Sequence, residues 1–185
     1  MKLIKYLFAT LTAISLLIAC GPNIPQEKMD ELSALDQKLD SVILLVETVD
    51  SARAVNAVGT FEKNIEIIQY DLKDTFPRET AFFVDSYYRL KKALRNFARD
   101  YNMLSNELVI AEQQLKDLRT DAENGLIEVE QFNDYLVLET ENINELKAVS
   151  ESIIPPMQKA LPIFEEKNPR IDSIIQAYKA KQMNQ

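Results

Sequence analysis

Apolar residues recur at alternating spacings of four and three residues along most of the chain after residue 28. A β-strand would instead alternate at every second position, so this period indicates helices with one buried face. The longest run continues without a fault over about six heptads, as in the seam of a coiled coil, and predicts a single helix over residues 78–123. Its members are Phe83, Tyr87, Leu90, Leu94, Phe97, Tyr101, Leu104, Leu108, Ala111, Leu115, Leu118 and Ala122.

Two shorter runs of the same kind occupy residues 26–75. The first comprises Leu32, Leu35, Leu39, Val42, Val46 and Val49, and the second Ala54, Val58, Phe61, Ile65, Ile68 and Leu72. Their phase slips near residues 50–53. The segment is therefore either one long helix with a stutter or two helices with a break near 51–58. Ile43, Leu44 and Leu45 widen the first stripe, which suggests burial on more than one side.

A fourth run extends from Val129 to Met157 and is less regular. Glu139 and Ser150 occupy two of its seam positions. We expect Pro155, Pro156 and Pro162 to break or kink this helix, because an interior proline removes a hydrogen bond and clashes with the preceding turn. Asn168 and Pro169 resemble an N-cap and first residue, and predict a last short helix that frays after residue 178.

The connections between these segments are short. Pro77 separates the second and third segments, and Gly125 ends the long seam, since glycine closes a helix without steric cost. Short connections make neighbouring helices antiparallel. The sequence thus predicts an all-α fold: an elongated antiparallel bundle of three to four long helices with coiled-coil-like seams over residues 26–185.

The composition excludes several classes of chemistry. The 185 residues include no histidine, no tryptophan and one cysteine, and the formal net charge is −8. Histidine-based acid–base catalysis, histidine metal sites and intramolecular disulfides are thereby removed. The acidic balance disfavours nucleic acid as a partner. We expect no catalytic residue, no metal and no cofactor, and a protein that is not an enzyme.

Residues 1–19 have the pattern of a secretory signal rather than of a fold. A basic start containing Lys2 and Lys5 precedes an uncharged apolar stretch, which ends in Leu17-Ile18-Ala19-Cys20. This ending resembles the lipobox of bacterial lipoproteins. The resemblance implies that residues 1–19 are a lipoprotein signal peptide and that Cys20 carries a diacylglyceryl group and further acyl chains such as palmitate. Two or more acyl chains form a stable membrane anchor.

The same resemblance implies a location. Gly21 replaces the aspartate that retains enteric lipoproteins in the inner membrane, so outer membrane is favoured over inner, on either the periplasmic or the surface face. Residues 20–25 form the lipidated cysteine and a short tether.

A second part of the chain resembles uncharacterised helical lipoproteins of Bacteroidetes-type bacteria. The residues that carry this resemblance are Leu115 to Gly125, Tyr135 and Glu139-Thr140-Glu141. That likeness supports a helical hairpin and an envelope address, and it implies no site.

Three groups of residues are candidates for chemistry. Glu139, on the seam, either is partly buried with a raised pKa, or reaches the edge of the bundle or pairs with a base and fixes register. Phe82, Phe83, Tyr87 and Tyr88 form either a ligand pocket or part of the core. Residues 120–131 match the length of a calcium loop around Gly125 but lack its ligand pattern, so we predict a plain hairpin turn there.

A cluster of five bases without an acid lies between Arg89 and Arg99. Four of them, Arg89, Lys92, Arg95 and Arg99, fall on the outward face of the predicted helix. This patch either binds an anionic partner or is a solvated helix face.

The expected function is a lipid-anchored envelope module that contacts an envelope protein or polymer. The alternative is a carrier for a small apolar or anionic ligand held between helices.

Overall fold

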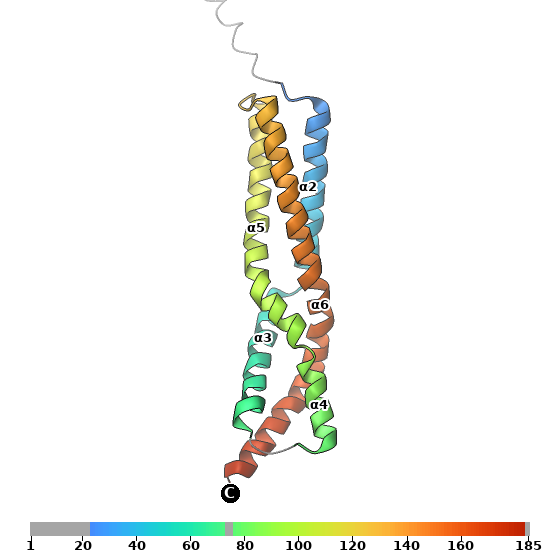
Figure 1. The fold of residues 1–185 in the computed structure, drawn as a ribbon, viewed down its shortest axis with the longest axis vertical. Helices are drawn as coiled ribbons and strands as arrows, with labels where there is room; N and C mark the ends of the chain where they lie inside the picture. The colour runs from blue at the N-terminus through green and yellow to red at the C-terminus, as the bar shows by residue number, and fades with distance from the viewer. Residues whose placement is uncertain (1–22, 73–75, 184–185) are drawn as a thin grey trace, which may run out of the picture. The chain divides into compact units, whose positions relative to one another are not determined.

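The computed structural model describes residues 23–72 and 76–183, and it is an all-α helical bundle (Figure 1). It divides into two compact units, which are described separately below. Unit 1 contains residues up to Leu39 together with Ile110–Ile143, and unit 2 contains Asp40–Val109 and Asn144–Gln185. The elements in chain order are α2 (Gln26–Glu47), α3 (Ser51–Glu66), the π-helical turn η1 (Ile67–Asp71), α4 (Arg78–Tyr88), α5 (Lys91–Glu123) and α6 (Val129–Met183).

Unit 1 consists of the first turns of α2, the last turns of α5 and the first turns of α6. A tight hairpin joins α5 to α6, as Figure 1 shows. Gly125 has a φ of 63°, and the Leu126 N–H donates to the Asp121 carbonyl over 2.8 Å. The Gly125 N–H donates to the Ala122 carbonyl over 3.2 Å, which completes a Schellman motif. The predicted hairpin turn is therefore present.

A buried apolar seam and one ion pair hold α2 against α5 in unit 1. The buried side chains are Leu32, Leu35 and Leu39 on α2 and Ala111, Leu115, Leu118 and Ala122 on α5. The Arg119 guanidinium of α5 forms an ion pair with Asp36 of α2 and also donates to the Ser33 hydroxyl. Both partners of the ion pair are partly exposed. Packing of the apolar seam therefore accounts for most of the stabilisation here.

Three aromatic rings form the centre of unit 2. Tyr87 of α4 lies 5.0 Å from Phe61 of α3 and 5.9 Å from Phe164 of α6, measured between ring centroids. Tyr87 and Phe61 are fully buried, and Phe164 nearly so. Aromatic pairs at such separations add to the stabilisation from burial alone. They join α3, α4 and α6.

A polar network continues from the Tyr87 hydroxyl. The hydroxyl donates to Asn168 Oδ1 over 2.8 Å, and the amide of Asn64 donates to Asn168 Oδ1 and Asp172 Oδ1 over 3.0 and 2.9 Å. The Asn168 amide in turn donates to Asp172 Oδ2 over 3.0 Å. Buried polar groups are costly without partners, so this network restricts how α3, α4 and α6 can pack together in unit 2.

The first helical segment is broken, and the two-helix alternative is confirmed. The break lies at residues 48–50, a few residues before the predicted position. Asp50 has an extended conformation, and its carboxylate accepts the Arg53 N–H over 3.0 Å. The physical reason for the earlier break is this N-cap, which begins α3 at Ser51. The expected double-sided burial of the first helix is wrong at Leu44, which is 64% exposed.

The predicted single helix over residues 78–123 is interrupted at Arg89 and Leu90, which separates α4 from α5. No proline or glycine lies there. Instead the Leu90 N–H donates to the Tyr87 carbonyl over 3.1 Å, a bond to the third preceding residue that tightens the last turn of α4. The turn directly follows Tyr87, and we attribute it to the tertiary contacts of that side chain. Leu90 and Leu94 nevertheless remain buried, so the seam survives the interruption.

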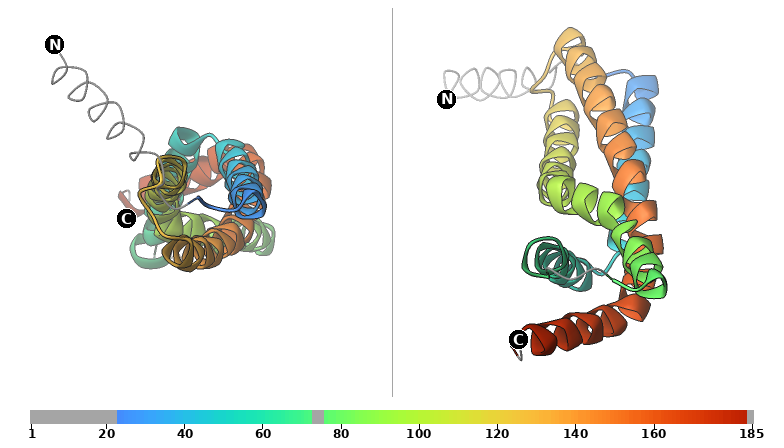
Figure 2. Two further views of the ribbon diagram at one scale, coloured as in Figure 1. Left: turned by 90° about the horizontal axis from the view of Figure 1, so that it is seen from above. Right: turned by 60° about the horizontal axis from the view of Figure 1, so that its bottom comes forward.

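The proline-rich end of α6 departs most from expectation. Pro155, Pro156, Pro162 and Pro169 all lie inside one helix of 55 residues, and the separate last helix is not formed. Asn168 is therefore no N-cap. Ile153, Ile154, Met157, Ala160, Leu161 and Phe164 around these prolines are buried, and their burial outweighs the lost hydrogen bonds. The stretch changes direction in Figure 2, consistent with the predicted kinks.

Candidate functional site

Cys20, the proposed lipid attachment site, lies outside the described residues. Ile24, which follows it in the assigned tether, is 5% exposed and is already part of the unit 1 core. Pro25 precedes α2, and its carbonyl accepts the N–H groups of Lys28 and Met29. No helix among the described residues combines the length and apolarity needed to span a membrane.

The four bases of the predicted patch are all exposed in unit 2: Arg89 lies in the turn between α4 and α5, and the other three lie on α5. Three of them have carboxylate partners. Arg89 pairs with Asp85 at 2.9 Å, Arg95 with Glu62 at 3.7 Å and Arg99 with Asp100 at 2.7 Å. Lys92 has no ion-pair partner in the part of the chain that the structure describes. The outward placement is thus as predicted, and the carboxylates reduce the positive charge of the patch.

The aromatic group at the start of α4 divides between core and surface. Tyr87 is core, and its burial raises its pKa to about 12. Phe82 is 63% exposed, with the Arg78 guanidinium 5.5 Å from its ring centroid. These side chains therefore do not converge on one pocket, and basic groups cover the outer rings.

Tyr88 and Phe83 show the same arrangement in unit 2. The Lys91 ammonium lies 4.7 Å from the Tyr88 ring centroid and donates to its hydroxyl, which lowers the pKa of Tyr88. Arg170 and Lys167 of α6 lie 4.3 and 5.1 Å from the Phe83 ring centroid. Such cation–π contacts add modest stability at exposed positions. Lys91, Lys167 and Arg170 are thus three further cations that lie against α4.

Glu139 is the seam residue with the most unusual surroundings. It is 9% exposed, and its Oε2 is buried with no hydrogen-bond partner in the described structure. Burial raises the pKa of this carboxyl, while a hydrogen bond with Asn142 lowers it. The predicted burial of Glu139 is confirmed. It forms no ion pair with a base of the described chain, so the register-fixing pair that the sequence suggested is absent there.

A pocket of about 230 Å³ adjoins Glu139 in unit 1. It is open to solvent and lies between the last turns of α5 and the first turns of α6. Its walls are Gln114, Asp117, Leu118 and Asp121 on α5, Ile127 at the hairpin, and Tyr135 and Glu139 on α6. Three of these seven side chains are carboxylic acids and none is basic. Glu139 could be recognised from the sequence as a seam residue, whereas the other two acids could not.

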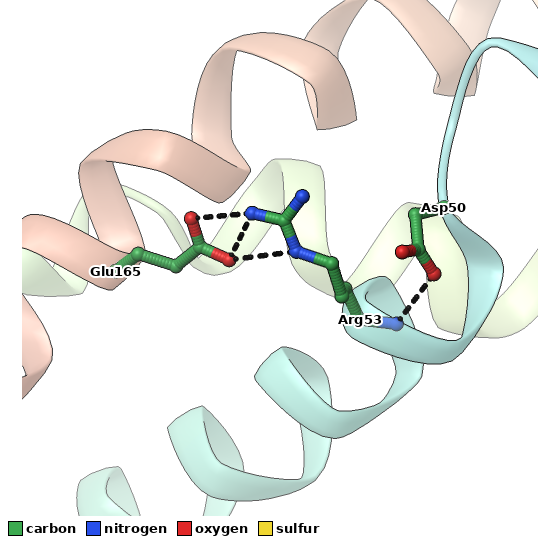
Figure 3. Close-up of polar contacts among 3 residues, drawn as sticks. All are labelled: Asp50, Arg53 and Glu165. Carbon is green, nitrogen blue, oxygen red and sulfur yellow. Dashed lines mark hydrogen bonds and ion pairs between the residues drawn. The ribbon is translucent and has the colours of Figure 1, made fainter.

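Arg53 and Glu165 form a second feature that sequence reasoning missed. The Arg53 Nη2 lies 2.7 and 2.8 Å from the two carboxylate oxygens of Glu165, and its Nε lies 3.2 Å from Oε1 (Figure 3). The hydrogen bond and the charge of Glu165 raise the pKa of Arg53. Both side chains are exposed. The pair joins α3 to α6 beside a pocket of about 220 Å³, and no periodic signal in the sequence relates residues so far apart.

The described residues contain no group of three or more histidine, cysteine, aspartate or glutamate side chains placed to hold a metal ion.

No family model matches the chain, and comparisons with curated proteins and with solved structures likewise found no match. The functional interpretation therefore depends on the side chains themselves.

Proposed function

We propose that the protein is a lipid-anchored, non-enzymatic helical module of the bacterial cell envelope, held in the membrane through Cys20 and acting by contact with an envelope protein or polymer. The lipobox-like ending Leu17 to Cys20 supports the anchor. The helical seams support binding at the surface rather than in the interior, because packed apolar side chains occupy their interior positions. Cations and carboxylates remain mostly at the surface.

The observation that carries the proposed contact role is the exposed basic patch of Arg89, Lys92, Arg95 and Arg99. The side chains in its ion pairs are exposed except for Asp100, which is partly buried, and exposed pairs contribute little free energy. An anionic partner can therefore replace the carboxylates at small cost. The protein as a whole is acidic, so a local basic surface also orients an approaching anionic group.

The carrier alternative receives less support. Four pockets along the described residues have volumes of about 220 to 350 Å³, near or below the lower end of the range of about 300–1,000 Å³ usual for drug-sized ligands. The pocket beside Glu139 is bordered by three carboxylates, which disfavours an anionic ligand. We therefore favour the contact module over a carrier of apolar or anionic ligands.

Photo-crosslinking in living cells tests the contact role. Met103 is 56% exposed and follows Arg99 by one helical turn, so a benzophenone amino acid there lies next to the patch. We expect a specific crosslinked product, which is lost when Arg89, Lys92, Arg95 and Arg99 are all changed to Gln. The matched control changes Lys63, Lys116, Lys147 and Lys159 to Gln, which removes the same charge from other exposed positions. Equal loss in both variants, or no product at all, would refute the patch as the contact surface.

A further inference from the structure

Tyr88 directly follows the buried Tyr87 on α4, but its surroundings in unit 2 are different. The Tyr87 side chain is buried and its hydroxyl donates to Asn168, whereas Tyr88 is partly exposed and its hydroxyl lies at the protein surface. The Lys91 ammonium, three residues later, donates to the Tyr88 hydroxyl and lies 4.7 Å from the centroid of the Tyr88 ring. The Tyr88 oxygen is therefore both accessible and in contact with a cation.

These contacts favour the ionised form of the Tyr88 side chain. An ammonium has three N–H donors and no acceptor, so the phenolic oxygen is the acceptor in the bond with Lys91. A bond donated to this oxygen stabilises the phenolate more than the neutral phenol, and it is the largest cause of the lowered pKa of Tyr88. A hydrogen bond with Gln69 and the charge of Arg95 act in the same direction, and desolvation opposes them.

Ionisation affects reactivity because the phenolate is a much stronger nucleophile than the neutral phenol. At a pH below the pKa, each unit by which the pKa falls increases the phenolate fraction about tenfold. A lower pKa also weakens the attack of each anion, but for thiolates this loss is only about half as large on a logarithmic scale. We expect the same balance for a phenolate. An accessible tyrosine bonded to an ammonium should therefore react faster than one that is only exposed.

We propose that Tyr88 is a modification site that accepts an electrophilic sulfonyl group on its phenolic oxygen, with Lys91 as the positioning residue. In the step with a sulfonyl fluoride, the phenolate oxygen forms a bond to sulfur, the sulfur–fluorine bond breaks, and fluoride leaves. The phenolic proton passes to solvent, and no atom is oxidised or reduced. Lys91 remains protonated and stabilises the negative charge on the oxygen until the new bond forms. This reactivity is independent of the proposed contact role.

Peptide mapping by mass spectrometry after brief treatment with benzenesulfonyl fluoride tests the proposal. The reagent is neutral, so attraction between a charged reagent and the lysines does not contribute. In the full chain in mild detergent at mildly alkaline pH, we expect Tyr88 to be modified about fivefold or more faster than Tyr70 and Tyr135. Tyr70 and Tyr135 are 76% and 51% exposed, so accessibility alone would favour them over Tyr88.

Variants at Lys91 separate the effect of the ammonium from the effect of exposure. Lys91→Gln should slow the modification of Tyr88 about fivefold or more, because the charged donor is lost. Lys91→Arg keeps a cationic donor and should restore a rate within about twofold of the wild type. The control Lys116→Gln removes the same charge from an exposed position in unit 1 and should leave the Tyr88 rate unchanged.

The proposal would be overturned if Tyr88 in the wild type reacted no faster than Tyr70 and Tyr135. It would also be overturned by an equal Tyr88 rate in the wild type and in Lys91→Gln, or by a Lys91→Arg variant that reacts as slowly as Lys91→Gln. Modification of the Lys91 nitrogen instead of the Tyr88 oxygen, which peptide fragmentation distinguishes, would contradict it as well. If the Lys91 variants lose their helical circular dichroism, the comparison of the three tyrosines within the wild type decides alone.

Discussion

At the scale of single residues, a few polar side chains inside the seams determine what is particular to this bundle. Glu139 and Ser150 could be recognised from the sequence because they interrupt an apolar run. Asn64, Asn168 and Asp172 could not, because each lies beside a seam and their contact depends on how three helices meet. The same holds for the pocket at Glu139. Its aspartates come from another helix, and no periodic pattern indicates which polar residues face each other across two helices.

Tyr87 gives a residue-scale prediction about pH. Burial raises its pKa to about 12, whereas an unfolded tyrosine ionises near pH 10. Between these values the unfolded chain binds fewer protons than the folded one, so the free energy of unfolding falls as pH rises from 10 to 12. The full shift corresponds to roughly 2–3 kcal/mol. Urea unfolding of the wild type and of Tyr87→Phe at several pH values in this range measures the contribution.

The control for Tyr87 is the neighbouring Tyr88, whose pKa is lowered by the hydrogen bond from Lys91. We expect Tyr88→Phe to retain the loss of stability between pH 10 and 12, and Tyr87→Phe to show less of it. The ionisation of lysines and of other tyrosines is common to all three proteins and cancels in the comparison. If Tyr87→Phe depends on pH as strongly as the wild type, Tyr87 ionises freely and its buried position is wrong.

At the scale of elements, the sequence predicts faces better than ends. Ten of the twelve seam positions between Phe83 and Ala122 are buried, and Phe83 and Tyr101 are partly so. The faces are predictable because burial follows the helical period. The ends are less so. Gly125 ends α5 as predicted through its positive φ, but the interruption after Tyr87 and the continuity of α6 through four prolines come from tertiary packing, which overrides local preference.

The seam itself gives an element-scale prediction. Leu104 is 1% exposed in the middle of α5, and its neighbour Met103 is 56% exposed. Leu104→Asp should lower the free energy of unfolding by several kcal/mol, because it removes apolar burial and places an unpaired charge in the core. Met103→Asp introduces the same charge at the surface and should change stability by about 0.5 kcal/mol or less. Urea unfolding measures both, and similar losses in the two variants would contradict the assigned face.

At the scale of the whole molecule, the all-α class follows from the helical period of the seams. The proposed envelope role follows from the first twenty residues and from the surface left outside the seams. We propose that the protein acts by contact with other molecules through its exposed basic patch of Arg89, Lys92, Arg95 and Arg99. Its single thiol has a consistent place in this account, because lipidation of Cys20 would leave the mature protein without a free cysteine.

The intact mass of the protein extracted from bacterial membranes tests the central claim most directly. We predict a polypeptide that begins at Cys20 and carries a diacylglyceryl group on its sulfur, with a further acyl chain on the new amino terminus. Cys20→Ser should yield an uncut, unlipidated precursor. A protein that retains Met1 or an unmodified Cys20 thiol, or a Cys20→Ser variant that is still matured and still requires detergent for extraction, would contradict the lipid-anchored module.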